Sequence, residues 1–430
     1  MTTDPHADAA THRSKLVDLA CELLAVDTSN PPGATRAIVE VIEEHLADVP
    51  VETERFAVDP AKPNLLARLS GAADRTFLFV GHLDTVPFDE TEWTRDPLGE
   101  YVEASPEGPE EDRIYGRGAT DMKGAIVSML FALRSFARPD HEPPVDISFA
   151  FVSDEEVGGD AGLPSLLEPD RIADGWLDAD ACLIGEPTGD RTRHSVTVAD
   201  RGSIWLTLDA TGDAAHGSRP VLGENAIDRL YDAVTVLRER FGSRQLDVDA
   251  TMAPILEESV AYYAPTMGAE TARDLFERPS INLGTIEGGD AINTVPASAR
   301  AEIDVRLLAG VHTPTILEEI RECVGACAGV TIADVSWSIG TAEAIDGPLP
   351  EAVASTAETV TGERVYRRSA TGGGDVKTLR NAGISAVDFA IGTDTVHAPD
   401  EFIPVDALVE NAEIYAQVPA AWAETIEDSA

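Results

Sequence analysis

The apolar residues in the first half of the chain follow two different spacings. Apolar side chains recur every three to four positions over residues 16–24, 37–46 and 125–136, which predicts helices. Residues 77–80, 145–152 and 181–184 are almost continuously apolar and end at glycine or polar residues, as strands buried on both faces do. Strands that alternate with helices predict an α/β sheet containing several parallel strands.

The pattern changes after residue 195. Alternating apolar and polar residues at 204–208 predict a half-exposed antiparallel strand. The following segments predict a helix, two strands, a helix and a strand, at 225–241, 281–286, 299–307, 314–327 and 330–337. This order is that of a ferredoxin-like sandwich. We therefore expect an α/β domain of residues 1–195 and 342–430, interrupted by an α+β domain of residues 196–341. An acidic insertion at 242–279 is expected to be partly helical, around 269–276.

The charge of the chain is unusual for a protein of 430 residues. It has 32 basic and 77 acidic residues, a formal net charge of -45. Such a field repels nucleic acids and anionic membranes, so we expect neither as a partner. Only four basic residues are lysines. An acidic, lysine-poor surface is typical of halophilic proteins, whose self-repulsion is screened by salt; an acidic mesophilic protein is the alternative.

The cysteines and the N-terminus indicate a protein of the cytoplasm. The four cysteines are too few and too scattered for a disulfide framework. Residues 1–6 contain no apolar segment of the kind found in signal peptides, and no apolar run is long enough to span a membrane.

Polar side chains that bind divalent metal ions lie at the ends of the apolar runs. They are His82 and Asp84 after 77–80, Glu155 and Glu156 after 145–152, Glu186 after 181–184, Asp121 before 125–136, and His397 in a late loop. Two imidazoles with three or four carboxylates match the needs of two zinc ions that share one carboxylate. Taken alone, the His82/Asp84 pair is more often part of a solvated loop, and the acids at 154–156 are more often one more cluster on an acidic surface.

These residues occur in motifs that resemble one known family. The motifs are Gly81–Pro87, Gly116–Gly124, Asp154–Gly159, Gly185–Thr188, His216–Pro220, Asp304–Arg306 and His397 with Asp400-Glu401. In this order they are similar to the dinuclear-zinc family of aminoacylases, acetylornithine deacetylases, succinyl-diaminopimelate desuccinylases and glutamate carboxypeptidases. The resemblance implies a mixed-sheet, zinc-exopeptidase-like catalytic domain with an inserted lid and dimerisation domain.

The resemblance also implies roles for individual residues. One zinc would be held by His82 and Glu186, the other by Glu156 and His397, with Asp121 bridging them and followed by a cis peptide bond. Cobalt or manganese could substitute for zinc. Asp84 would orient His82 from behind. Glu155 would act as general base toward a hydroxide that bridges the metals.

Residues of the inserted domain are implied in substrate binding. His216 would reach across a homodimer to stabilise the oxyanion, and Arg306 would clamp an α-carboxylate. Asn293 and Gly373 match substrate-facing positions. Without the resemblance, His216 could be a loop histidine and Arg306 could simply pair with nearby acids.

The implied activity is hydrolysis of the amide bond of a small N-acyl amino acid. A carboxypeptidase or dipeptidase with the same site is the alternative. A third hypothesis is a non-catalytic relative that binds metal. The sequence feature that argues against it is Glu155, which is retained beside all five ligands.

Overall fold

The computed structural model describes residues 13–99, 101–103, 112–168 and 175–429, and it has two compact units. The N-terminal segment 1–6 lies outside the described residues. The first unit contains the described residues up to Val198, residues 343–367 and those from Gly374 onward. The second unit contains residues 199–342 and 368–373.

The first unit is built around the strands β1 (Glu52–Phe56), β2 (Asn64–Leu69), β3 (Ala73–His82), β6 (Val145–Val152), β7 (Ala181–Ile184), β9 (His194–Ala199), β16 (Val365–Ser369) and β17 (Ser385–Asp388). Its helices are α2 (Arg13–Leu24), α3 (Arg36–Leu46), α4 (Lys123–Phe136), α5 (Leu163–Leu166), α11 (Pro348–Thr361), α12 (Asp375–Asn381) and α13 (Val405–Ser429). Short strands complete it: β4 (Tyr101–Glu103), β5 (Arg113–Tyr115), β8 (Gly189–Asp190), β18 (Ile391–Gly392) and β19 (Phe402–Pro404).

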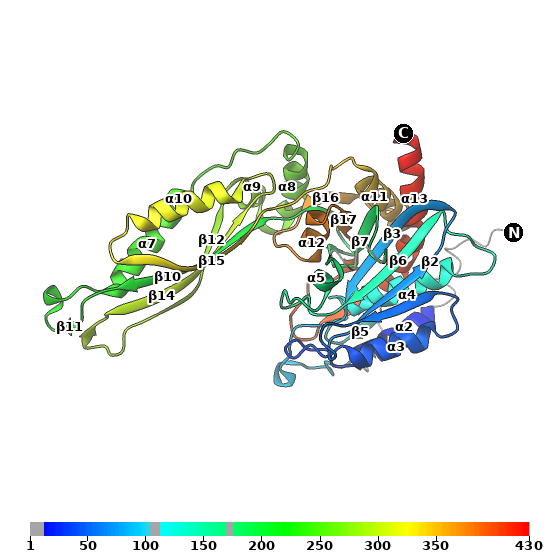
Figure 1. Cartoon of the computed structure of the whole chain (residues 1–430), viewed down its shortest axis with the longest axis horizontal. Coiled ribbons are helices and arrows are strands. Elements are labelled where there is room, and N and C mark those ends of the chain that lie inside the picture. Colours follow the sequence, from blue (N-terminus) through cyan, green and yellow to red (C-terminus); the bar gives the residue numbers. More distant parts are fainter. Residues whose placement is uncertain (1–12, 100, 104–111, 169–174, 430) are drawn as a thin grey trace. The chain divides into compact units, whose positions relative to one another are not determined.

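The large sheet is mixed, as the sequence predicts, and runs in the order β1-β2-β6-β3-β7-β17-β9-β16 (Figure 1). The four central strands β6, β3, β7 and β17 are parallel, whereas β2 and β9 pair with them in the antiparallel sense. The carboxyl ends of the parallel strands therefore meet at one edge.

β3 is buried on both faces because its alternate side chains pack against different helices. Phe77 and Phe79 face α13, with ring-centroid distances of 5.5 Å to Trp422 and 5.8 Å to Tyr415. Leu78 points to the other face, into a hydrophobic cluster that includes residues of α5 and α12. Burying each such side chain contributes roughly 1.5–3 kcal/mol, so the strand that ends at His82 is firmly held.

The second unit contains β10 (Gly202–Thr211), β11 (Ala215–His216), β12 (Ser280–Gly288), β13 (Thr294–Val295), β14 (Ser298–Leu307) and β15 (Val330–Ser338), with α7 (Ala226–Phe241), α8 (Ala253–Met267), α9 (Ala269–Glu277) and α10 (Thr313–Gly325). Its antiparallel sheet has the order β12-β14-β10-β15, and α7 and α10 both contact it (Figure 1). With β10 as the first strand this is the ferredoxin-like order, which confirms the predicted fold class.

The structure differs from the sequence-based expectation at the borders and in the insertion. Residues 368–373 join the second unit, where the Ala370 N–H donates to the Ala199 carbonyl over 2.7 Å. The insertion contains α8 as well as α9. Its pattern is obscured because the buried face of α8 includes Ser259, whose hydroxyl donates to the Ile255 carbonyl and accepts the Ser369 N–H.

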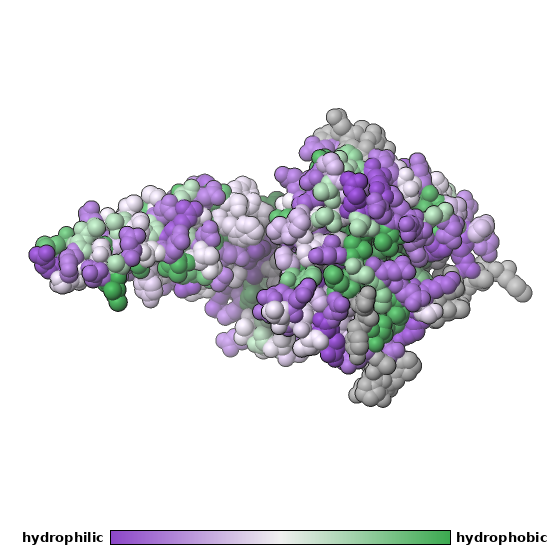
Figure 2. Space-filling view, turned by 90° about the horizontal axis from the view of Figure 1, so that it is seen from below, coloured by the Kyte–Doolittle hydropathy of each residue, from purple (hydrophilic) through white to green (hydrophobic). Residues whose placement is uncertain are grey.

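The face of the molecule in Figure 2 is mainly hydrophilic, with hydrophobic residues in small separate areas. Among the described residues, no helix combines the length and the apolar character that crossing a membrane requires. All four cysteines are free.

Candidate metal centre

Six of the predicted residues come together at the carboxyl edge of the large sheet. His82 ends β3, and Glu155, Glu156 and Glu186 follow β6 and β7. The segment just before α4 adds Asp121, and the loop between β18 and β19 adds His397. The peptide bond after Asp121 is cis, as the resemblance implies.

Asp121 lies between the two histidines. Its Oδ1 is 3.1 Å from Nε2 of His82, and its Oδ2 is 3.2 Å from Nε2 of His397. Glu186 completes the His82 side at 3.4 Å, and Glu156 completes the His397 side at 3.3 Å. Each side thus has an imidazole, a terminal carboxylate and one oxygen of a shared carboxylate, which is the donor set of a bridged pair of metal ions.

The electrostatics of the cluster favour bound positive charge. Burial opposes protonation of His82, yet hydrogen bonds with Asp121 and Glu186 hold its pKa well above the usual value. Hydrogen bonds with Asp121 and Glu156 raise the pKa of His397 to about 10. A divalent cation would displace these protons, because metal ligands bind in their deprotonated form. Ligand atoms of His82, Asp121 and Glu156 lie within 4.8 Å of one another, as do those of His82, Glu155 and Glu186, so the residues fit such ions.

Glu155 has the environment of a general base. Burial, with added repulsion from Asp121 and Glu156, raises its pKa to about 7, the range in which a base works at neutral pH. Asp375 is a neighbour that sequence reasoning missed: burial and then Glu155 raise its pKa to about 8. A side chain at Gly374 would place its Cβ only 3.1 Å from Glu155 Oε1, so the glycine turn leaves room for the Glu155 carboxylate.

Asp84 makes different contacts from those expected. Its carbonyl oxygen, not its carboxylate, accepts from Nδ1 of His82 at 2.9 Å, while the carboxylate is 3.9 Å away. This bond leaves the lone pair of Nε2 free for a metal. The carboxylate instead accepts the backbone N–H groups of Glu155 and Glu156, at 3.1 and 3.2 Å. Asp84 therefore orients His82 through its backbone carbonyl, and it holds the loop of Glu155 and Glu156 through its side chain.

Glu401 and Arg117 hold together the loops that contain Asp121 and His397. The fully buried Glu401 carboxylate accepts the backbone N–H groups of Thr120 and Asp121, at 2.8 and 3.0 Å. It also accepts from Nη1 of Arg117 at 2.7 Å, and Nη2 of Arg117 donates to the His397 carbonyl at 3.4 Å. The sequence signals for this role were the motif Gly116–Gly124, which contains Arg117, and the Asp400-Glu401 pair following His397.

His216 and Asn293 lie together in the second unit. His216 is in β11, which pairs with β13, and Gly217 next to it donates to the Asn293 carbonyl at 2.6 Å. The exposed imidazole accepts the Ser218 N–H through Nδ1, at 3.1 Å.

Arg306 projects from β14 of the same unit. Its Nε donates to Asp304 at 2.8 Å, and its guanidinium carbon is 5.8 Å from the ring centroid of Trp205. Among the described residues its Nη groups make no hydrogen bond. The hydrogen bonds between Arg306 and Asp304 thus use only Nε of the guanidinium group. Gly373 belongs to the segment 368–373, between β16 and α12.

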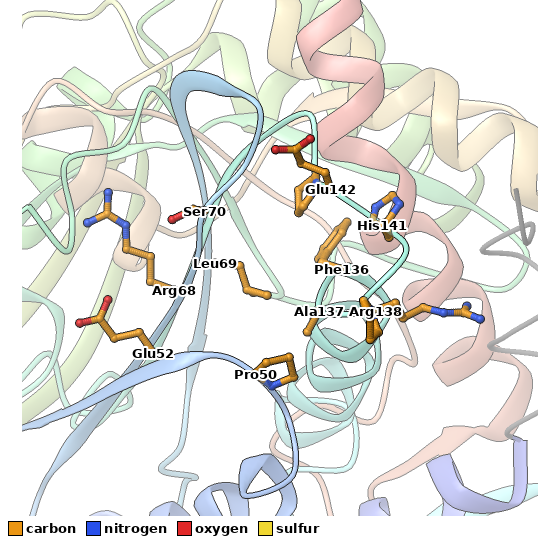
Figure 3. A pocket seen from close by; sticks show the side chains of 12 residues that line it. Pro50, Glu52, Arg68, Leu69, Ser70, Phe136, Ala137, Arg138, His141 and Glu142 are labelled. Carbon is orange, nitrogen blue, oxygen red and sulfur yellow. The ribbon is translucent and has the colours of Figure 1, made fainter.

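A separate pocket of about 670 Å³ lies at the opposite edge of the large sheet (Figure 3). It is lined by Ser70 and Pro143, which precede β3 and β6, whereas His82 ends β3. Figure 3 shows the charged ends of Arg68 and Arg138 extending to opposite sides of Phe136. Because its charged groups do not converge, this pocket lacks the chemistry of the cluster around His82.

A curated relative resembles most of the chain. Succinyl-diaminopimelate desuccinylase from Rhodospirillum centenum is 31% identical over 362 residues, covering 84% of this chain and 84% of the relative.

Solved structures share the fold. An M20 family metallo-carboxypeptidase from Sulfolobus solfataricus superimposes with a TM-score of 0.77 at 19% identity, covering 95% of this chain and 99% of the other. The di-peptidase Dug1p from Saccharomyces cerevisiae gives 0.75 at 15% identity, covering 98% of both chains. A family model matches residues 78–421, which include every residue of the proposed metal centre. The chain belongs to peptidase family M20/M25/M40.

Proposed function

We propose that this protein is a zinc-dependent deacylase that hydrolyses the amide bond of N-acyl amino acids. As a member of its family, it is a metal-dependent hydrolase of amide bonds. The observation that carries the finer proposal is the placement of Glu155, with its raised pKa, among the histidines and carboxylates that surround Asp121. The desuccinylase relative, named for an acylated amino-acid substrate, supports the deacylase class.

The proposed roles follow from the contacts. His82 and Glu186 would hold one metal, Glu156 and His397 the other, and Asp121 both. When bound, such metals lower the pKa of water and polarise a carbonyl. Glu155 takes a proton from the attacking water and returns it to the leaving amine nitrogen.

Residues of the second unit are proposed to recognise the substrate. The Nη groups of Arg306 suit bidentate binding of a free α-carboxylate, because Asp304 engages only Nε. Asn293 and Gly373 are proposed to contact the substrate. His216 is proposed to donate to the developing oxyanion.

We further propose that the protein is a homodimer in which His216 serves the partner's site. Apolar residues beside β11 and β13 are strongly exposed: Val221 at 88%, Leu222 at 69% and Ile292 at 106%. Exposed apolar side chains of this kind are typical of a surface that is covered by a partner protein. Light scattering that gave the monomer mass at micromolar concentration would remove this proposal.

A substrate screen tests the deacylase class. We expect turnover of acetyl- or succinyl-amino acids by protein loaded with zinc, cobalt or manganese. Dipeptides are the competing substrates, because the solved structures named above are a carboxypeptidase and a di-peptidase. Turnover of dipeptides alone would replace the deacylase proposal with the peptidase one.

The screen is best run in molar KCl. We propose a cytoplasmic protein of a salt-accumulating organism, because a net charge of -45 destabilises a compact chain unless salt screens it. We expect the thermal unfolding temperature to rise steadily with KCl concentration. A higher unfolding temperature in dilute buffer would contradict the halophilic proposal.

A further inference from the structure

We infer that Asn30 is a positioning residue of the hydrolytic site, joining the Asp84 carboxylate to Asp154 and thereby holding the loop of Glu155. This inference rests on the proposed function for its kinetic test, although its metal-binding test does not.

The amide of Asn30 uses both of its hydrogens on carboxylates. Nδ2 donates to Asp84 Oδ2 at 2.8 Å and to Asp154 Oδ1 at 3.0 Å. Asn30 is 3% exposed, and both carboxylates are buried. Only the NH₂ end of the amide can serve two carboxylates, so the orientation of the side chain is determined by its partners.

These two carboxylates hold the loop that carries the base and a proposed ligand. Asp84 accepts the N–H groups of Glu155 and Glu156, as described above. Asp154 begins the loop with a φ of 70°, a left-handed conformation that is uncommon for a residue other than glycine. Its Oδ2 accepts the N–H of Ala161 at 3.3 Å. The Asn30 amide therefore links the two carboxylates, of Asp84 and Asp154, that hold this loop in place.

Asn30 also separates like charges. Lys62 forms an ion pair with Asp154, so one of the two carboxylates has a cationic partner. The other, Asp84, is bound by backbone N–H groups and by Asn30. Without the amide hydrogens, two buried carboxylates would face each other in a poorly polarisable interior, where their repulsion is strong.

The position of Asn30 is built into the fold. Its backbone N–H donates to the Thr85 carbonyl at 2.8 Å, next to Asp84. Gly33, at a φ of 73°, approaches so closely that a Cβ there would lie 2.6 Å from the Asn30 amide carbon. An asparagine whose only role is to stabilise a turn forms its side-chain hydrogen bond with the backbone of the residue two positions later. The partners of Asn30 are instead 54 and 124 positions away.

The test compares Asn30→Asp and Asn30→Ala with a matched control, Asn411→Asp. Asn411 is also a buried amide, but it bonds the backbone N–H and carbonyl of Ile391, away from the loop. Each full-length variant is loaded with cobalt, and its absorption spectrum, metal content, unfolding temperature, kcat and KM are measured.

We expect both Asn30 variants to lower metal affinity or kcat by about 10- to 100-fold, with a changed cobalt spectrum and little change in KM. Asn411→Asp should lower the unfolding temperature while leaving the spectrum and kcat close to wild type. If Asn30→Asp does not fold, Asn30→Ala, which adds no charge, decides the matter. A wild-type spectrum and kcat in Asn30→Ala would overturn the inference.

The two proposals can fail separately. If the wild-type protein hydrolyses no substrate of the screen, the proposed function fails, while the spectrum and metal content still decide on Asn30. Equal changes of spectrum in the Asn30 and Asn411 variants would show a general loss of stability and overturn the positioning role.

Discussion

Replacing Glu155 by glutamine will lower kcat by about 10²- to 10⁴-fold, the contribution of a general base, and will leave metal content unchanged. Glutamine keeps the shape and an acceptor oxygen but cannot take a proton from water. The burial that raises the pKa of Glu155 to about 7 marks it as a base suited to neutral pH. Kinetics on the best substrate of the screen, with metal analysis by mass spectrometry, check this expectation.

The control for this prediction is Asp160→Asn. Asp160 is an exposed acidic residue in the same loop, so its replacement removes one negative charge without touching the cluster. We expect its kcat to stay within about twofold of wild type, as for most surface substitutions. Glu155 also lies within ligand distance of His82 and Glu186. If Glu155→Gln lost one metal equivalent, Glu155 would be a ligand and the general base would have to be sought elsewhere.

Replacing Glu401 by alanine will destabilise the protein by about 3–5 kcal/mol, because it leaves the buried Arg117 charge without its partner. The side chains of this pair are 4% and 0% exposed, so water cannot take over the role of the carboxylate. The backbone N–H groups of Thr120 and Asp121 lose their acceptor as well. Urea unfolding measures the effect, and metal affinity should fall by about 10- to 100-fold because the Asp121 and His397 loops are released.

A double variant distinguishes the effect of an unpaired Arg117 charge from the effect of losing the volume of the Glu401 side chain. In Arg117→Met/Glu401→Leu both charges are removed, so we expect a smaller loss of stability than in Glu401→Ala, although the metal affinity stays low. A double variant less stable than Glu401→Ala would show that an unpaired buried charge is not the cause.

The centre of the large sheet is the part of the fold that the sequence predicts best. The apolar run 77–80 predicted a strand buried on both faces, and β3 has Phe77 and Leu78 packed on opposite sides. Residues that follow such runs in parallel strands must meet at one edge, which is why His82, Glu156 and Glu186 could be proposed together. By contrast, α8 was missed because the polar Ser259 lies on its buried face.

The sequence by itself determined the central strands β3, β6 and β7 and the candidate metal ligands that follow them, because both depend on the local spacing of apolar residues; the outer strands β1 and β16 were not predicted. Only the tertiary structure decided which groups support these residues. Asp84 proved to bind His82 through its carbonyl oxygen, and Asn30 and Glu401 proved to be the buried partners of the ligand loops. The partners of these hydrogen bonds are as far as 284 positions apart, and a hydrogen bond depends on distances and angles that no local pattern contains.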